Sequence, residues 1–235
     1  MNKETTSLKF VVIEGPDGSG KATQTKLLTN FLKSKKKKVK KIDFPQYGKK
    51  SAGLIEEYLN GKYGKSKEVG PYRASIFYAC DRYDASFKLK KWIENGYIVV
   101  ADRYVSSNVA HQGGKIKNKK ERKKYLNWLY HLEYNIFGIP KPKITIILKT
   151  STEISYKLSS EIKDKEKIAK KQLYLGKKKR DIHEKDKGHL KDSLEVYLEM
   201  AREYPRDFKI VECVEKGKLL SPEEIHHKIK KVLNL

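Results

Sequence analysis

The sequence predicts an α/β protein in which a parallel five-stranded sheet is flanked by helices. Short apolar runs alternate with longer amphipathic segments along the chain, which is the pattern of strands joined by crossover helices. The runs are nearly continuous, as expected of strands buried on both faces of a parallel sheet. The chain has 235 residues and contains neither an internal repeat nor a Pro/Gly/Ser-rich linker. We therefore expect one domain over residues 1–235.

The strands and helices are expected from local periodicity, charge runs and turn residues. Val, Ile, Phe and Tyr dominate the expected strands, which cover residues 10–13, 39–44, 97–101, 143–148 and 208–214. Amphipathic spacing predicts helices over residues 23–32, 51–59, 71–94, 121–137 and 190–204. A polar turn and helix start are expected over residues 104–114. Ser221 and Glu224 form a capping-box signature that opens a last helix.

A glycine-rich stretch from Gly15 to Lys21 lies between the first strand and the first helix. Its glycines allow successive backbone amides to converge on an anion, and the new helix directs its positive dipole end to the same place. Lys21 adds a mobile charge for outer phosphates. The alternative is a turn that merely joins strand to helix, but the context favours a nucleoside triphosphate site. The expected binding residues are Gly15, Pro16, Asp17, Gly18, Ser19, Gly20, Lys21, Ala22 and Thr23.

Composition limits the other classes of function. Lys and Arg number 53 against 29 Asp and Glu, giving a net charge of +24. This excess leaves a nucleic-acid-binding ATPase as an alternative, but the lysines are spread without interleaved aromatics, which favours a solvated surface. The two cysteines lack zinc-site or disulfide spacing. No apolar run approaches the roughly 20 residues of a membrane span, so we expect a cytoplasmic protein without a membrane partner.

Polar and aromatic residues follow two of the expected strands, at the edge where ligands of parallel sheets bind. Asp102 ends one strand and is expected to hold the water shell of a metal, with Arg103 beside it near a transferable phosphate. A plain salt bridge is the alternative for Arg103. Phe44 and Tyr47 follow another strand, where they serve either as packing aromatics or as substrate contacts.

Two further segments suggest a site for a planar base. Tyr78 and Arg82 lie four residues apart on one helix face, so a ring and a guanidinium could grip a base together. Core packing for Tyr78, and pairing of Arg82 with Asp81 or Asp84, are the alternatives. Asn108 offers a donor and an acceptor that suit a pyrimidine edge.

The segment from residue 159 to residue 187 changes character. It is crowded with lysines around one glycine, and it contains a single arginine, Arg180. A mostly charged segment has little to bury, so we expect a lid that closes on phosphates. A solvated helical hairpin is the alternative.

Several of these motifs together resemble the thymidylate kinase family of phosphate-loop nucleoside monophosphate kinases, and the resemblance runs over nearly the whole chain. Its most specific part is Asp102-Arg103-Tyr104 with Asn108, spaced behind Tyr78 and Arg82. The loop at residues 15–21, Phe44-Pro45-x-Tyr47-Gly48 and the basic lid complete it.

The resemblance implies a role for each matched residue. Lys21 and the loop amides would hold ATP, Asp17 would lie near the acceptor's phosphate, and Arg103 would bind the transferring phosphate. Phe77 or Tyr78 would stack on thymine, with Arg82 and Asn108 reading its edge. His111 would lie near the sugar 2′ position and disfavour ribose, while Tyr47 would touch sugar or phosphate. Arg180 would supply the closing cation, and Glu184 would steady metal or sugar.

The implied reaction is in-line transfer of a phosphoryl group from MgATP to thymidine monophosphate, by a homodimer. The family pattern is broken at Ala22, which lacks the usual hydroxyl ligand, so Mg²⁺ would be held by phosphates, waters and Asp17 or Asp102. It is broken again at Gln46, where relatives often carry Arg. A sister kinase acting on another nucleoside monophosphate or a deoxynucleoside remains the nearest alternative.

Overall fold

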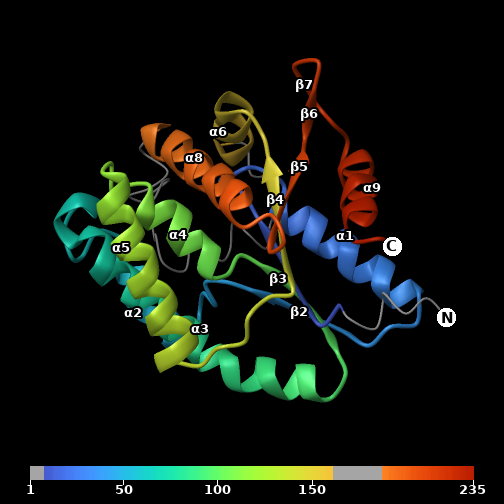
Figure 1. The fold of residues 1–235 in the computed structure, drawn as a ribbon, viewed down its shortest axis with the longest axis horizontal. Coiled ribbons are helices and arrows are strands. Elements are labelled where there is room, and N and C mark those ends of the chain that lie inside the picture. The colour runs from blue at the N-terminus through green and yellow to red at the C-terminus, as the bar shows by residue number, and fades with distance from the viewer. Residues whose placement is uncertain (1–7, 161–186) are drawn as a thin grey trace.

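The computed structural model describes residues 8–160 and 187–235. Five parallel strands form the central sheet in the order β2-β3-β1-β4-β5, which confirms the predicted fold class (Figure 1). The strands are β1 (Phe10–Glu14), β2 (Val39–Asp43), β3 (Ile98–Asp102), β4 (Ile144–Lys149) and β5 (Phe208–Glu212). β1 lies in the middle of the sheet, so the loop that follows it opens at the centre of the ligand edge.

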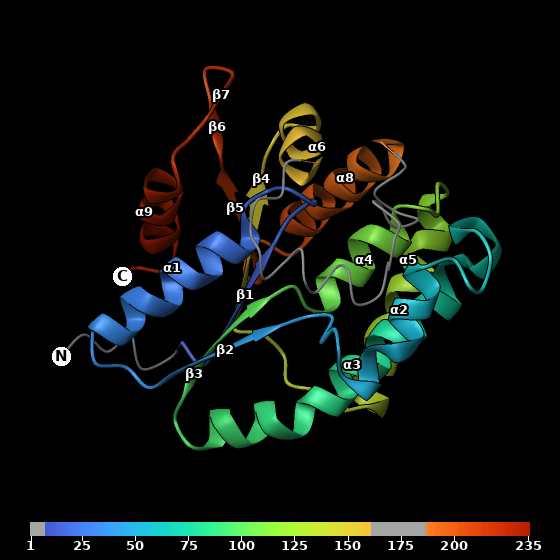
Figure 2. The same cartoon turned by 180° about the vertical axis from the view of Figure 1, so that it is seen from behind.

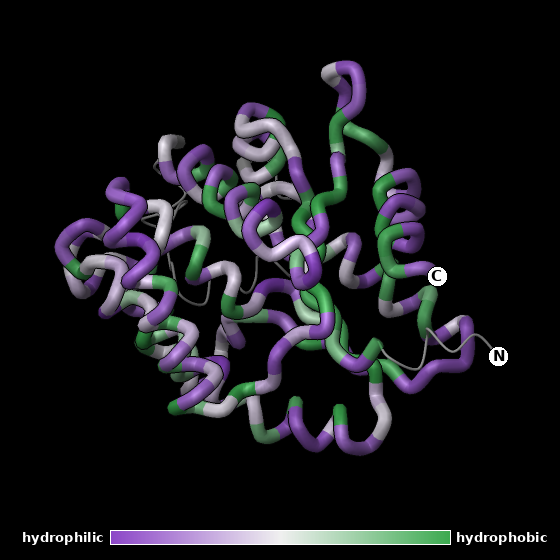
Figure 3. Tube along the Cα trace, in the orientation of Figure 1, coloured by the Kyte–Doolittle hydropathy of each residue, from purple (hydrophilic) through white to green (hydrophobic). Residues whose placement is uncertain are grey.

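Helices cover both faces of this sheet. They are α1 (Lys21–Ser34), α2 (Gly53–Leu59), α3 (Ser66–Glu94), α4 (Val105–Gly113), α5 (Lys119–Tyr130), α6 (Thr152–Ser160), α8 (Lys187–Glu203) and α9 (Pro222–Val232). Residues of α1 and α9 pack on one face against alternate residues of β1, while α3, α4, α5 and α8 pack on the other (Figures 1 and 2). In Figure 3 the strands are mainly hydrophobic and the outer helices largely hydrophilic, in keeping with this layering.

Besides shifts of one to three residues at the ends of other elements, four features of the secondary structure differ from the expectation. The helix expected from residue 71 begins at Ser66, because Gly70, with φ 75°, kinks the chain before Pro71 and lets a short helical piece precede it. The helix expected over 121–137 ends as the π-helical segment η3 (His131–Ile136). A 3₁₀ turn, η2 (Lys50–Ala52), precedes α2. The last strand ends early and is followed by an unexpected hairpin, β6 (Val214–Glu215) and β7 (Lys218–Leu219).

Capping at the last helix follows the sequence signature. Ser221 Oγ accepts a hydrogen bond from Glu224 N at 3.2 Å, and Glu224 Oε2 accepts one from Ser221 N at 2.7 Å. Across residues 8–160 and 187–235, none of the helices combines the length and the apolar character needed to span a bilayer.

Candidate active site

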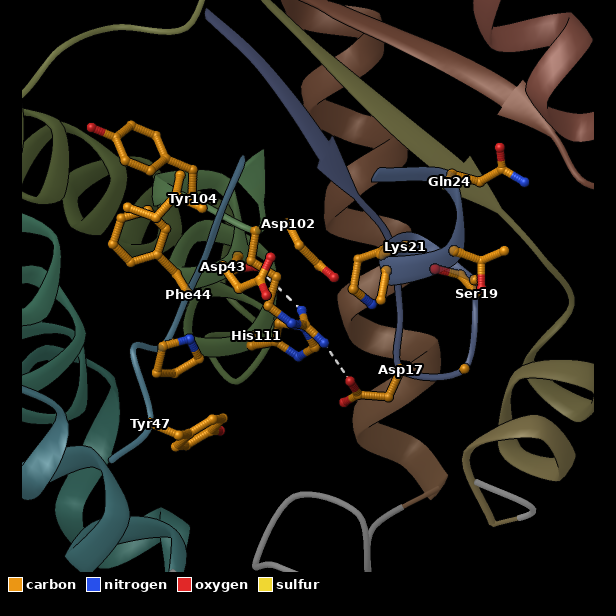
Figure 4. Close-up of a pocket in the computed structure, with 18 of the residues that line it drawn as sticks. Asp17, Ser19, Lys21, Gln24, Asp43, Phe44, Tyr47, Asp102, Tyr104 and His111 are labelled. Atoms are coloured by element: carbon orange, nitrogen blue, oxygen red, sulfur yellow. Dashed lines mark hydrogen bonds and ion pairs between the residues drawn. The ribbon is translucent and has the colours of Figure 1, made fainter. Parts of the chain in front are cut away.

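A cavity of about 830 Å³ opens where the carboxyl ends of the strands meet (Figure 4). It brings together most of the residues expected from the sequence, which come from separate segments of the chain. The predicted residues that line it are Asp17, Gly18, Ser19, Gly20, Lys21, Ala22, Thr23, Phe44, Tyr47, Tyr78, Arg82, Asp102, Arg103, Asn108 and His111. Gly15 and Pro16 belong to the same loop but are not among the residues that line the cavity.

The glycine-rich loop has the conformation that its sequence predicts. Gly15 has φ +143°, and a Cβ there would lie 2.7 Å from the Leu148 carbonyl oxygen. At Gly18, with φ +83°, a Cβ would overlap the Ser155 carbonyl oxygen of α6. Side chains are therefore excluded at both positions. Lys21 Nζ donates to the carbonyl oxygens of Gly15 at 3.0 Å and Pro16 at 2.8 Å, which holds its ammonium over the loop.

Arg103 reaches across from the end of β3 to the phosphate loop. Its Nη2 donates to Asp17 Oδ1 in an ion pair, and its Nη1 donates to Ser107 Oγ at 3.2 Å. The backbone of Arg103 has φ 69°, a left-handed conformation that is strained for a residue with a Cβ. Strain of this kind persists where surrounding contacts enforce it, and here the Arg103 amide donates to the Ile13 carbonyl oxygen at 3.0 Å.

Glu14, which was not among the residues expected at the site, stabilises this strained turn. Its carboxylate is fully buried and accepts from Tyr104 N at 2.8 Å and from Ser107 Oγ at 2.8 Å. Ser106 Oγ, at 3.0 Å, and the Tyr197 phenol oxygen, at 2.7 Å, donate to it as well. The sequence signal that could have identified Glu14 is its position, because an acidic residue there directly follows the apolar run of the first strand. Glu14 thus ties β1, the start of α4 and α8 together behind Arg103.

The charges of the cavity shift one another's pKa. Burial opposes ionisation of Asp17, but Arg103 and Lys21 outweigh it and hold the pKa of that carboxyl well below its usual range. Burial would lower the pKa of Arg103, yet Asp17 raises it, so the guanidinium stays charged. Burial also lowers the pKa of Lys21 to about 8, with Arg103 adding to this effect and Asp17 opposing it.

The two aromatic candidates for base stacking occupy different places. Tyr78 lines the cavity, whereas Phe77 does not and packs instead against Tyr58 and Tyr63, with ring centroids 6.1 and 5.6 Å away. Of the two alternatives the structure thus favours Tyr78 over Phe77, because one residue further along a helix turns a side chain by about 100°. Stacking of Tyr78 on a base stays a prediction.

Arg82 and Asn108 are both held by protein partners. Arg82 Nε and Nη2 donate to Glu133 at 2.8 and 2.5 Å, and both side chains are almost completely buried. The ion-pair partner of Arg82 is thus Glu133, which lies in the π-helical segment η3, and not Asp81 or Asp84. Asn108 Nδ2 donates to the Ser75 carbonyl oxygen at 3.1 Å. Both residues still line the cavity, and their contact with a base stays a prediction.

Gln46 replaces an expected arginine, and two lysines stand beside it. Asp81 fixes the Gln46 side chain by accepting from Nε2 at 3.2 Å. Gln46 Oε1 accepts from Lys49 Nζ at 2.9 Å and from Lys88 Nζ. Both lysines line the cavity, so positive charge is present here without the arginine.

The donor set fits a magnesium ion that takes most of its ligands from phosphates and water. Asp17 and Asp102 supply carboxylates at the cavity wall, although Asp17 Oδ1 is engaged by Arg103. Ser19 Oγ is buried without a hydrogen-bond partner among the described residues, which makes it a candidate for the hydroxyl ligand that Ala22 lacks. Residues 8–160 and 187–235 contain no cluster of three or more His, Cys, Asp or Glu that could bind a metal ion through protein ligands alone. Such sparse oxygen ligation is usual for Mg²⁺.

Two expected site residues, Arg180 and Glu184, lie outside the described residues, as does most of the expected lid at 159–187. Their roles stay predictions. Leu158 and Ser159, near the end of α6, line the cavity beside the phosphate loop.

Comparison with known proteins places the chain in a family. The family model described as thymidylate kinase matches residues 13–218. The thymidylate kinase of Sulfurihydrogenibium sp. is 36% identical over 185 residues, covering 76% of this chain and 85% of that protein. That of Mycobacterium tuberculosis is 29% identical over 147 residues, covering 62% of this chain and 68% of that protein.

Solved structures agree on the fold. The thymidylate kinase structure from Candida albicans superposes with a TM-score of 0.69 at 22% identity, covering 96% of this chain and 91% of that one. The structure from Ehrlichia chaffeensis gives a TM-score of 0.61 at 19% identity, covering 96% and 98%. With the family match over most of its length and a cavity built from the expected motifs, the chain belongs to the thymidylate kinase family.

Proposed function

We propose that this protein transfers the γ-phosphoryl group of ATP to thymidine monophosphate, giving ADP and thymidine diphosphate. The observation that carries the proposal is the meeting of Arg103 with Asp17 inside the cavity that Tyr78 also lines. Arg103, which directly follows β3, contacts the phosphate loop between the proposed triphosphate site and the proposed base site. Family membership supplies the acceptor, and the cytoplasm is the compartment in which we place the reaction.

The transfer needs no nucleophile from the protein. An oxygen of the acceptor monophosphate attacks the γ-phosphorus, and the bond to the bridging oxygen of ADP breaks, so the protein contributes position and positive charge. Lys21 and the loop amides hold the donor phosphates, and Arg103 stabilises the charge on the transferring group. Bound Mg²⁺ would neutralise donor phosphate charge, held by Asp17 or Asp102 with Ser19 nearby.

An acceptor panel tests the proposal. The acceptors are the monophosphates of thymidine, uridine, deoxyuridine, adenosine and guanosine, together with the nucleoside thymidine. With MgATP as donor, we expect thymidine monophosphate to give the highest kcat/KM of this set. The thymidylate kinase of Candida albicans has broad substrate specificity, so the panel should include both ribose and deoxyribose acceptors. Preference for uridine or adenosine monophosphate would favour a sister kinase. ATP hydrolysis stimulated by DNA or RNA would favour the nucleic-acid alternative.

Binding of ATP should weaken as the pH rises past the pKa of Lys21. That pKa is lowered to about 8, and donor phosphates favour the protonated ammonium, so binding takes up a proton above this pH. From about pH 7.5 to about pH 9 we expect the Kd for ATP to rise about tenfold. Calorimetry in two buffers of different ionisation enthalpy would detect the proton uptake. An unchanged Kd with no proton uptake would contradict this assignment.

We also propose that the protein is a homodimer, formed through the outer face of α3 and η3. This face exposes a cluster of large apolar side chains: Tyr72, Ile76, Tyr83, Phe87 and Ile136. Phe87 and Ile136 are each 63% exposed. Clustered apolar residues of this size on a surface commonly mark a protein interface.

Charge placed on this face should separate the subunits. We expect Phe87→Lys to be monomeric in analytical ultracentrifugation at a concentration at which the parent chain sediments as a dimer, because the lysine would bury a charge in the interface. Tyr204→Lys replaces another exposed ring, which follows the end of α8, and serves as the control. A parent chain that is already monomeric, or a dimeric Phe87→Lys, would rule this face out.

A further inference from the structure

Two histidines from different helices form a chain of side chains that ends on Arg103. His111 lies in α4, and Figure 4 shows it in the cavity facing the phosphate loop. His111 Nε2 lies 3.1 Å from Arg103 Nη1, and His111 Nδ1 lies 3.0 Å from His189 Nε2. His189 belongs to α8 and is 6% exposed. The two rings stand 5.1 Å apart between centroids.

The hydrogen bonds that link Arg103 to His111 and His111 to His189 can run in one direction only. An arginine guanidinium donates and never accepts, so His111 Nε2 must be the acceptor and cannot carry a proton. A neutral imidazole with a bare Nε2 has its proton on Nδ1, and that proton points to His189 Nε2. His189 Nε2 is consequently an acceptor as well. Burial and the neighbouring Arg103 lower the pKa of His111 well below its usual value, which agrees with a neutral ring.

The histidine pair contacts one terminal nitrogen of the Arg103 guanidinium, and Asp17 contacts the other. Nη1 has two acceptors, Ser107 Oγ and His111 Nε2, while Nη2 is bound by Asp17. Ser107 is fixed in turn by Glu14, so its position does not depend on the histidines. The His111 ring depends more on its second contact, because without an acceptor at Nδ1 only the hydrogen bond from Arg103 favours this tautomer and this ring orientation.

We propose that His189 is a positioning residue for phosphoryl transfer, which acts through His111 by fixing the tautomer and ring orientation that accept from Arg103. This rests on the proposed function, because Arg103 is placed there at the transferring phosphate. His189 lies in the first turn of α8, so the contact also ties the orientation of Arg103 to the docking of α8 on α4. Around bound metals, a hydrogen bond that orients a ligand histidine is worth about 10- to 100-fold in affinity or activity, and for His111, which we do not assign as a metal ligand, we expect an effect at the lower end of this range.

Two substitutions separate positioning from packing. His189→Leu introduces an apolar side chain of similar size that offers no acceptor, whereas His189→Gln offers Oε1 near the place of Nε2. We expect His189→Leu to lower kcat with thymidine monophosphate about tenfold and to leave KM for ATP within about twofold. His189→Gln should recover most of the loss. His227→Leu, at an exposed histidine of α9, is the matched control and should behave as the parent.

The tautomer gives a readout that does not depend on turnover. Nitrogen-15 spectra of the imidazoles should show His111 with a bare Nε2 and a protonated Nδ1 in the parent chain and in His189→Gln, and a mixture of tautomers in His189→Leu. A parent chain without thymidine monophosphate kinase activity would overturn the proposed function, while the spectra would still test the histidine chain. Parental kcat in His189→Leu, no recovery in His189→Gln, or a protonated Nε2 on His111 would each overturn the inference.

Discussion

Replacing Arg103 by alanine is expected to lower kcat by about 10³-fold or more while the chain stays folded. The guanidinium lies at the phosphate loop with its charge secured by Asp17, and the developing charge of the transition state would form beside it. Alanine suffers the same left-handed strain at φ 69° as arginine, so the backbone cost does not change. Steady-state kinetics with saturating MgATP and thymidine monophosphate would measure the effect.

A matched control exists where α5 meets α8. Arg122 pairs with Glu199 at 2.6 Å, and its side chain is 13% exposed, close to the 17% of Arg103, but it does not line the cavity. Arg122→Ala should therefore retain parental kcat. Arg103→Lys keeps the charge but loses the fork that spans Asp17, Ser107 and His111, so its kcat should stay well below that of the parent. Parental turnover in Arg103→Ala would exclude the residue from the mechanism.

Removing Glu133 is expected to destabilise the fold more than removing a carboxylate at the surface. Glu133→Ala leaves the Arg82 guanidinium buried without its partner, and loss of one member of a buried ion pair costs about 3–5 kcal/mol of unfolding free energy. Urea denaturation would measure the loss. Glu121→Ala breaks an exposed pair with Lys124 and should leave the unfolding midpoint where it is in the parent. If Glu133→Ala changed the unfolding midpoint as little as Glu121→Ala, this would contradict the burial of the Arg82–Glu133 ion pair.

A double variant separates the structural role of Arg82 from its predicted contact with the base. Arg82→Met with Glu133→Leu removes both charges and fills similar volume, so it should regain most of the stability that Glu133→Ala loses. If Arg82 also hydrogen-bonds to the edge of the base, the KM of this stable double variant for thymidine monophosphate should be higher than that of the parent protein. A double variant with parental stability and parental KM would assign Arg82 to the core alone.

Local chemistry explains why much of the architecture was predictable. The phosphate loop depends on glycines close together in the sequence, and the strands depend on apolar runs that need no distant partner to be recognised. Parallel pairing then follows from the alternation of strands with helices, and it brings Asp102 and Arg103 to the edge where the loop opens. Tyr78 could be placed on a helix face, although the sequence alone did not separate it from Phe77.

What escaped prediction depends on partners far apart in the chain. Glu14 meets Tyr197, 183 positions away, and Arg82 meets Glu133, 51 positions away. No local pattern specifies such pairings, because the sequence offers 29 Asp and Glu residues and does not show which of them meets a given buried donor. The pairing of His111 with His189 across α4 and α8 is of this kind, since it requires the docking of two helices to be known first.

A crystal structure with thymidine monophosphate and a non-hydrolysable ATP analogue bound together tests the central claim most directly. We predict the triphosphate on the amides of Gly15–Lys21, thymine on Tyr78, and Arg103 in contact with the acceptor's phosphate. The attacking oxygen should lie about 3–3.5 Å from the γ-phosphorus, in line with the bond that breaks. A monophosphate bound away from Arg103, or two phosphates held too far apart to react, would contradict it.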